Sequence, residues 1–350
     1  MGNFASDNVT GISPQIMAAL ATANEGTAMP YGDDAITQGL RNRVSEVFER
    51  DCAVFPVATG SAANALALAT LVPRYGAVYC HREAHINVDE CGAPEFFTSG
   101  AKLVALDGPR AKIDAAAVEA AIDGVGDVHR VQPAAVSITQ ASELGAVYTP
   151  DEVSALSDLA NRHRLALHMD GARFANALVT LGCAPADITW RAGVDVLTLG
   201  ATKNGALAAE AVIFFDPAKA GAFEFLRKRG GHLFSKMRFV SAQLEAYLTD
   251  GHWLENARHA NALAKRLAEG LADLPGIELL NPVEANELFL ALPDAVVEGL
   301  EARGFRFYSW GKVGEKQVRL VTAFNTRPED VEAFIDAAVA LTGAAVRASA

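Results

Sequence analysis

One lysine of the sequence stands at the end of an apolar run, where its amine could act as a nucleophile. Lys203 follows residues 194–200, an almost uninterrupted apolar segment that predicts a short buried strand. Apolar surroundings disfavour the charged form of a lysine and make its amine more nucleophilic, as a lysine that bonds to a carbonyl carbon requires. A solvated surface lysine is the alternative, which the apolar flanks disfavour.

An acid and an arginine follow a second apolar strand. Asp170 and Arg173 come directly after the apolar residues 165–169. A carboxylate buried at a strand end needs a partner, and the protonated ring nitrogen of a pyridine cofactor is such a partner. Arg173 could hold a carboxylate through two parallel hydrogen bonds. A purely structural Asp–Arg pair is the alternative.

A third segment could bind a phosphate. In residues 58–64 a strand ends, Gly60 makes a turn and a helix begins. The free N–H groups of that helix start and the Ser61 hydroxyl would suit a phosphate, although a plain strand-to-helix turn has the same sequence pattern. The sequence has neither a GxGxxG pattern at this turn nor a P-loop lysine, so dinucleotide and P-loop sites lack support.

A fourth segment contributes a histidine. His85 lies just past the predicted strand 77–80 and could stack on an aromatic ring. A satisfied, non-catalytic histidine is the alternative. Cys80, His81, His85 and Cys91 have only a loose resemblance to metal-ligand spacing, and we predict no metal.

Alternating strands and helices must position these four segments. Apolar β-type runs predict strands at 52–57, 77–80, 103–106, 134–139, 165–169, 194–199 and 212–215, with helices between them. Such alternation indicates an α/β fold with a mostly parallel sheet covered by helices on both faces. Ligands of these folds lie beyond the carboxyl ends of the strands, which is where the four segments fall.

The second part of the chain has a different pattern. Two long helical patterns, at 235–250 and 253–274, precede short predicted strands at 277–280, 287–292, 305–310 and 318–321 and a closing helix from Glu329. We expect an N-terminal segment and large domain over residues 1–250, and a small α+β domain over 251–350.

Composition limits the class of protein. The chain has 350 residues, 51% of them hydrophobic, and a formal net charge of −12. An acidic chain is a poor candidate for binding nucleic acid or an anionic membrane. Its four cysteines form no CxxC pair and its start resembles no signal peptide, so we expect a reduced, cytoplasmic setting.

The ordered segments resemble the motifs of the L-threonine aldolases, in the β-eliminating lyase group of fold-type-I pyridoxal-phosphate (PLP) enzymes. The resemblance runs over nearly the whole chain. It comprises residues 5–10 (family R-S-D-T-V-T), 31–34 (Y-G-D-D), 59–64 (T-G-T-x-A-N), 84–85 (A-H), 168–173 (H-x-D-G-A-R), 202–203 (S/T-K) and 318–322 (V-R-L-V-T).

The resemblance implies the aspartate aminotransferase fold, a PLP cofactor and cleavage of L-β-hydroxy-α-amino acids to glycine and an aldehyde. Lys203, beside Thr202, would bond to the cofactor, and Asp170 would bind its ring nitrogen. The remaining implied roles are ring stacking and catalysis by His85, phosphate binding by Gly60 and Ser61, and substrate-carboxylate binding by Ser6, Arg173 and Arg319. Family members are typically homotetramers, in which Tyr31 and a basic loop, here 227–232 with Arg229, would reach a neighbour's site.

One segment departs from the family pattern. Where the family commonly has E-N-T-H-N-G, this chain has Thr-Gln-Ala-Ser-Glu-Leu-Gly at 139–145, and we expect Ser142 to replace the histidine. The identity of the base and the preferred aldehyde are therefore open. His85, directly or through a water, is our candidate for the base, and phenylserine-like substrates are a hypothesis. The alternatives are β-elimination or transamination on the same scaffold, or a non-catalytic α/β protein with a degenerate cofactor site.

Overall fold

The larger of two sheets carries the candidate site at the carboxyl ends of its strands. A computed structural model describes residues 2–311 and 317–349. Its seven-stranded sheet has the order β1-β7-β6-β5-β4-β2-β3. The strands are β1 (Ala53–Val57), β2 (Gly76–His81), β3 (Lys102–Leu106), β4 (Gln132–Thr139), β5 (Ala166–Gly171), β6 (Val196–Gly200) and β7 (Glu210–Phe214). Strand β7 is antiparallel to both neighbours and all other ladders are parallel, which confirms the mostly parallel sheet.

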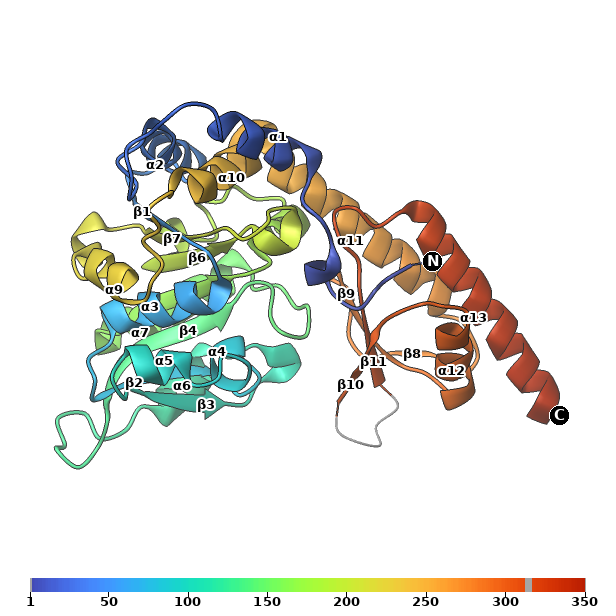
Figure 1. The fold of residues 1–350 in the computed structure, drawn as a ribbon. Helices are drawn as coiled ribbons and strands as arrows, with labels where there is room; N and C mark the ends of the chain where they lie inside the picture. Colours follow the sequence, from blue (N-terminus) through green and yellow to red (C-terminus); the bar gives the residue numbers. More distant parts are fainter. Residues whose placement is uncertain (1, 312–316, 350) are drawn as a thin grey trace.

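Helices cover both faces of this sheet (Figure 1). They are α1 (Pro14–Ala23), α2 (Ala35–Val47), α3 (Gly60–Leu71), α4 (His85–Val88), α5 (Ala93–Phe97), α6 (Ala115–Ala121), α7 (Pro150–His163), α8 (Phe174–Leu181), α9 (Phe223–Arg229) and α10 (Arg238–Leu248). Successive side chains of a strand point to opposite faces. Accordingly, Ile213 packs into the cluster that includes α2, α7 and α10, whereas its neighbour Phe214 packs into the cluster of α3.

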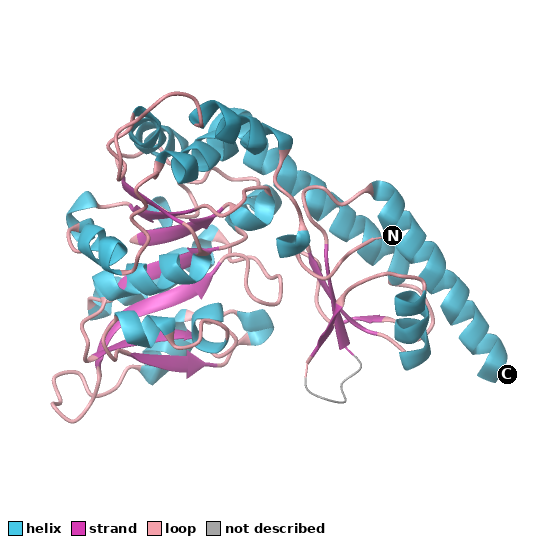
Figure 2. Cartoon of the chain, in the orientation of Figure 1, coloured by secondary structure: helices cyan, strands magenta, loops and turns pink. Residues whose placement is uncertain are grey.

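A second, four-stranded sheet is antiparallel throughout, with the order β10-β11-β9-β8. Figure 2 shows it apart from the larger sheet, with helices along one side. Its elements are α11 (His252–Leu271), β8 (Glu278–Leu279), β9 (Glu287–Ala291), α12 (Asp294–Ala302), β10 (Tyr308–Trp310), β11 (Gln317–Val321) and α13 (Pro328–Ser349). Helix α12 was not expected from the sequence, and β10 is shorter than the predicted strand at 305–310.

Two segments join the sheets. Helix α11 contributes Trp253 to the core of the large sheet and Leu267 to the core of the small one. Phe4, near the N-terminus, is fully buried in the small-sheet core, and its backbone N–H donates to Arg306 O at 2.7 Å. The domain boundary near Gly251 stays a prediction. No helix in the described ranges is long and apolar enough to cross a membrane.

Candidate active site

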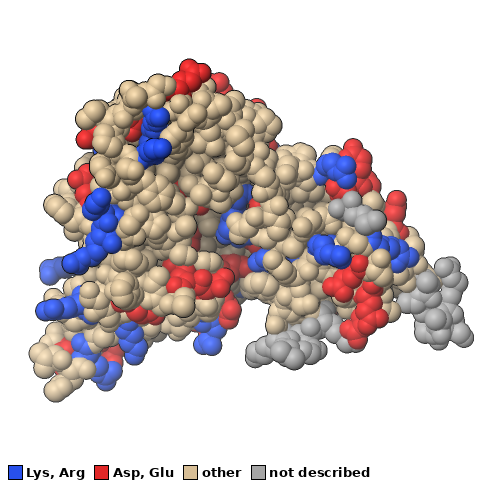
Figure 3. Space-filling view, in the orientation of Figure 1, with Lys and Arg blue, Asp and Glu red and all other residues tan. Residues whose placement is uncertain are grey.

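The carboxyl ends of the central strands surround a cavity of about 350 Å³. The backbone ladders align Thr139 of β4 with Asp170 of β5, and Asp170 with Thr198 of β6. Seven of the predicted site residues line the cavity: Gly60, Ser61, His85, Asp170, Arg173, Thr202 and Lys203. In the space-filling view, basic and acidic side chains meet at the recess between the two parts of the molecule (Figure 3).

The start of α3 forms one end of the cavity. Thr59 caps this helix, because its hydroxyl oxygen accepts a hydrogen bond from the Ala62 N–H at 3.3 Å. Gly60 and Ser61 lie in the first turn, where unpaired backbone N–H groups and the positive end of the helix dipole suit a phosphate.

Asp170 is a buried carboxylate whose oxygens are held in place. Its Oδ2 accepts a hydrogen bond from Asn64 Nδ2 at 2.7 Å, and its Oδ1 accepts one from the Ala172 N–H at 2.9 Å. The side chain of Asn64 is itself oriented by Thr198, whose hydroxyl donates to Asn64 Oδ1 at 2.7 Å. A carboxylate fixed in this way on the cavity wall fits a protonated ring nitrogen as its counter-charge.

Lys203 follows β6 in a short 3-10 helix (Thr202–Asn204) and lines the same cavity. Over the described part of the chain, its amine has neither a hydrogen bond nor an ion pair. Thr202 has a structural role, since its hydroxyl oxygen accepts from the Ala209 N–H at 3.2 Å. An unpartnered amine, a buried carboxylate and a helix N-terminus around one cavity fit the aldehyde, ring nitrogen and phosphate of PLP.

His85 and Glu143 line the cavity, and together with Glu90, which is bonded to His85, they form what we call the carboxylate cluster. His85 Nδ1 lies 2.8 Å from Glu90 Oε1, and this hydrogen bond raises the pKa of His85 against the opposing effect of burial. Burial also raises the pKa of Glu90, although His85 and Asn64 donate hydrogen bonds to it. Glu143 Oε1 accepts from the His85 backbone N–H at 3.0 Å.

A set of ion pairs adjoins the cavity at Arg173, and we call it the arginine cluster of Asp7, Arg173, Glu287 and Arg319. Arg173 donates two hydrogen bonds to the Asp7 carboxylate, at 2.8 and 3.1 Å, and lies 3.2 Å from Glu287 Oε1. Arg319 Nη1 is 3.9 Å from that same oxygen. Burial acts to raise the pKa of Asp7, but the charges of Arg173 and Lys203 outweigh it and lower that pKa. Burial raises the pKa of Glu287 despite both arginines.

Some predicted residues lie outside the cavity lining. Ser6 is buried beside the arginine cluster, where its hydroxyl donates to Asp7 Oδ1 at 3.4 Å, and Arg319 reaches the cluster through Glu287. Tyr31 is exposed, with the Lys228 ammonium 4.6 Å from its ring centroid. Arg229 is also exposed and ends α9, so residues 227–229 belong to a helix and the expectation of a loop there was wrong.

Ser142 does not lie where we expected a replacement for the histidine. Its hydroxyl donates to Arg110 O at 2.8 Å and accepts from the Ala146 N–H at 3.1 Å, so it closes its own turn. Ala141 and Glu143, on either side of it, line the cavity instead. Sequence reasoning missed Glu143, Asp7, Glu90 and Glu287 as site residues. Asp7 does lie within the family motif at 5–10, and Glu143 within the segment 139–145 that departs from the family pattern.

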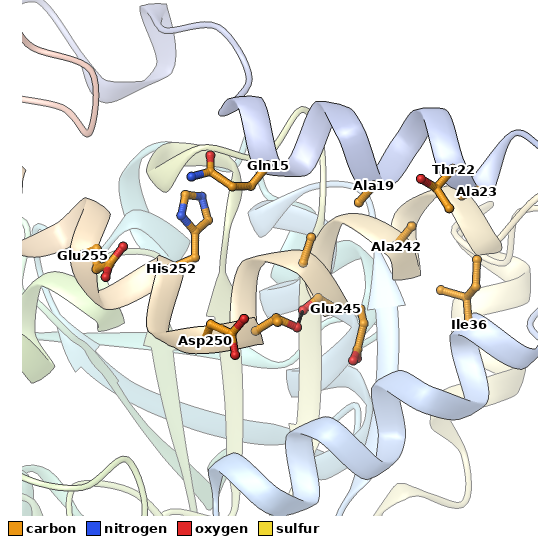
Figure 4. Close-up of a pocket in the computed structure, with 12 residues that line it drawn as sticks. Gln15, Ala19, Thr22, Ala23, Ile36, Ala242, Glu245, Asp250, His252 and Glu255 are labelled. Atoms are coloured by element: carbon orange, nitrogen blue, oxygen red, sulfur yellow. Dashed lines mark hydrogen bonds between the residues drawn. The ribbon is translucent and has the colours of Figure 1, made fainter.

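A second hollow lies apart from the predicted site residues. A more open hollow of about 540 Å³ lies between α1, α2, α10 and α11. Figure 4 shows His252, Glu255 and several alanines around it, and none of the predicted site residues. Among the described residues, no three histidine, cysteine or acidic side chains are grouped so that they could hold a metal ion.

Comparison with known proteins defines the class. The family model described as β-eliminating lyase matches residues 3–295. A solved structure of threonine aldolase from Leishmania major has a TM-score of 0.92 and 29% sequence identity, and the match covers 98% of this chain and 100% of that one. The chain therefore belongs to the β-eliminating lyase family.

Curated relatives narrow the class further. A low specificity L-threonine aldolase of Pseudomonas aeruginosa is 46% identical over 94% of this chain and 94% of its own length. A second, from a Pseudomonas species, is 45% identical over 92% of this chain and 93% of its own length. These matches confirm the L-threonine aldolase resemblance, the PLP cofactor and the assignment as a PLP-dependent lyase acting on a small-molecule amino acid. An Escherichia coli methionine aminotransferase, 13% identical with a TM-score of 0.72, shares the fold.

Proposed function

We propose that this chain cleaves L-β-hydroxy-α-amino acids, namely threonine, allo-threonine and phenylserine, to glycine and an aldehyde. The observation that carries the proposal is one cavity lined by an unpartnered lysine amine, a fixed buried carboxylate, a helix N-terminus and an arginine. The high identity to proteins named low specificity L-threonine aldolase supports the same reaction.

The residues that would hold the cofactor come from three elements. Lys203 would bond to its aldehyde carbon, Asp170 would pair with its ring nitrogen, and Gly60 and Ser61 at the start of α3 would bind its phosphate. Bound PLP supplies an electron-withdrawing ring joined to the amino group of the substrate. His85, at the cavity wall, would stack on that ring.

The substrate would be oriented by its carboxylate. Arg173 lines the cavity, and Arg319 and Ser6 lie beside it in or next to the arginine cluster. Holding the carboxylate would orient the bonds at Cα relative to the bound cofactor and so select the bond that is broken. A positioned substrate reacts faster because the entropy of alignment is lost on binding and not at the transition state.

The test is release of aldehyde from L-threonine, L-allo-threonine and L-phenylserine in the presence of PLP. We expect aldehyde and glycine in equal amounts, and no measurable release by Lys203→Ala. Lys265→Ala, at an exposed lysine of α11, is the matched control and should keep full activity. Pyruvate and ammonia from serine without glycine, or amino-group transfer, would overturn the aldolase reaction in favour of β-elimination or transamination on this fold.

We further propose a homotetramer in the cytoplasm, with sites shared between subunits. The exposed Tyr31 ring and the exposed basic side chains at the end of α9 support contact with a neighbour. In that assembly Tyr31 and Arg229 would complete the site of the adjoining subunit. Size-exclusion chromatography with light scattering tests this, and a monomer would exclude it.

A further inference from the structure

Glu143 is held in the cavity wall through one of its carboxylate oxygens. Glu143 Oε1 accepts a hydrogen bond from the Thr139 hydroxyl at 2.6 Å and another from the His85 backbone N–H at 3.0 Å. Thr139 is the last residue of β4 and is aligned with Asp170 in the β4–β5 ladder. The hydroxyl group that holds the Glu143 carboxylate therefore comes from the strand next to that of Asp170, the acid that we assign to the cofactor ring.

The second oxygen of this carboxylate is left without a partner. Glu143 Oε2 is a buried atom, and it receives no hydrogen bond from any residue that the structure describes. A buried polar atom without a partner is unfavourable, and in a native protein it calls for an explanation. Since Glu143 lines the cavity, a hydroxyl group of a bound molecule is a suitable donor.

The surroundings of Glu143 suit proton transfer near neutral pH. Burial raises the pKa of this carboxyl from 4.5 to about 7, although Thr139 and the His85 N–H donate to it. A general base works best when its pKa is close to the operating pH, because the deprotonated form is then populated and still basic.

The other candidates on the cavity wall are less suited to accept a proton. The hydrogen bond that His85 Nδ1 donates to Glu90 stabilises the protonated form of His85, and Nδ1 is already committed to that bond. Burial also raises the pKa of Glu210 to about 7, but Glu210 Oε2 accepts from the Ala201 N–H at 3.0 Å and its side chain bonds to Thr202. Glu143 thus combines a basic carboxylate with an available oxygen.

We propose that Glu143 is the catalytic base that takes the proton of the substrate β-hydroxyl group. This inference rests on the proposed aldolase function. Glu143 Oε2 accepts the hydroxyl proton, and the electron pair of the broken O–H bond becomes the second C–O bond of the aldehyde. The Cα–Cβ bond breaks with its electron pair left at Cα. Cα then takes up one proton from solvent to give glycine, and Glu143 releases the proton that it accepted to solvent, so the cycle neither gains nor loses a proton.

The decisive variant is Glu143→Gln, which keeps the size of the side chain and its ability to accept from Thr139. We expect the kcat for aldehyde release from L-phenylserine and L-threonine to fall by about 10²- to 10⁴-fold, the usual contribution of a general base. Glycine has no β-hydroxyl group, so exchange of its α-proton with deuterated solvent should stay within about threefold of the native rate. The cofactor absorbance and the glycine dissociation constant should also be unchanged.

Two further variants sharpen the test. Glu143→Asp retains a carboxylate at a greater distance and should keep more activity than Glu143→Gln. The native enzyme should show a limb near pH 7 in its kcat/KM profile that Glu143→Gln lacks. Glu83→Gln, at an exposed glutamate two residues before His85, is the control and should behave as the native enzyme.

The outcomes separate the two proposals. If the native enzyme releases no aldehyde, the proposed function fails. If the native enzyme releases aldehyde and Glu143→Gln does so at a similar rate, the assignment of Glu143 as the base fails and the aldolase function stands. If Glu143→Gln loses cofactor binding and glycine exchange together with cleavage, Glu143 is structural and the proposal is also overturned.

Discussion

The two clusters at the cavity differ in how their buried acids are paired. In the arginine cluster, Asp7 accepts two hydrogen bonds from Arg173 and its pKa is lowered. Glu287 lies 3.2 Å from Arg173 without a hydrogen bond from the described residues, and burial raises its pKa. In the carboxylate cluster, Glu90 Oε2 and Glu143 Oε2 are buried without hydrogen bonds from the described residues, and burial raises the pKa of both acids. The clearest contrast is between Asp7, whose pKa Arg173 helps to lower, and Glu143, whose pKa burial raises to about 7 so that its protonation can change near neutral pH.

The largest effect should come from breaking the arginine cluster. Arg173→Ala leaves the buried acids Asp7 and Glu287 without their nearest cation, and removal of one partner of a buried pair costs about 3–5 kcal/mol. We expect the free energy of unfolding, measured with urea, to fall by that amount, and the KM for the amino acid to rise. Arg191→Ala is the control, because Arg191 also pairs with two acids, at 2.7 and 2.8 Å, but at the surface. An equal loss of stability in both variants would contradict the prediction.

The next effect concerns the pH dependence of stability at Glu143. Its pKa is about 7 in the folded protein against 4.5 ordinarily, so the unfolded chain loses this proton first as the pH rises. The free energy of unfolding therefore falls between these two values, by about 3 kcal/mol in total at 1.36 kcal/mol per pKa unit. Glu143→Gln removes this titration, and its gain over the native protein in urea unfolding should be near zero at about pH 4 and largest at about pH 8.

Asp7→Asn provides the control of opposite sign. The pKa of Asp7 is lowered in the folded protein, so its contribution to stability is present above the ordinary value of 3.8 and is lost as the pH falls through the folded pKa. This variant should be less stable than the native protein at neutral pH, and the deficit should shrink on acidification. If the difference in free energy of unfolding from the native protein changed with pH in the same direction for Glu143→Gln and Asp7→Asn, the contrast between these two acids would be contradicted.

The smallest effect is confined to the carboxylate cluster. Glu90→Gln removes the charge whose hydrogen bond raises the pKa of His85, so we expect that pKa to fall. An NMR titration of the His85 ring measures it. Asp89→Asn is the matched control, because Asp89 Oδ2 lies 3.6 Å from His85 Nε2 at an exposed position and should leave the pKa unchanged. A larger shift in Asp89→Asn than in Glu90→Gln would show that the exposed acid controls the histidine.

Local sequence rules located the residues that follow strands or start helices. Lys203, Asp170 and Gly60 could be found because an apolar run, a strand end and a helix start are visible within a few residues. They line one cavity because parallel strands end at the same edge of the sheet. The fold class could be predicted for the same reason, since strand–helix alternation is a local pattern.

The arginine cluster could not be predicted from local sequence patterns. Asp7 and Arg173 are 166 residues apart, and Glu287 belongs to the other sheet, so their contact depends on how the N-terminal segment and the small sheet pack. The motif resemblance supplied both arginines but no reason to expect acids against them. Matching residues 139–145 to the family motif by position predicted that Ser142 replaces the histidine. In the structure the Ser142 hydroxyl bonds within its own turn, and Glu143 lines the cavity instead.

The turn closed by Ser142 has a consequence for engineering the enzyme in the synthetic direction. The Ser142 hydroxyl donates to Arg110 O and accepts from the Ala146 N–H, and neither bond involves the side chain at 141. Any catalyst of a reversible cleavage also catalyses the condensation of glycine with an aldehyde. Because Ala141 lines the cavity and is also buried against Val147, Ala177 and Ala285, a library at position 141 limited to small side chains, with Glu143 kept, would test which aldehydes are accepted for making new β-hydroxy amino acids.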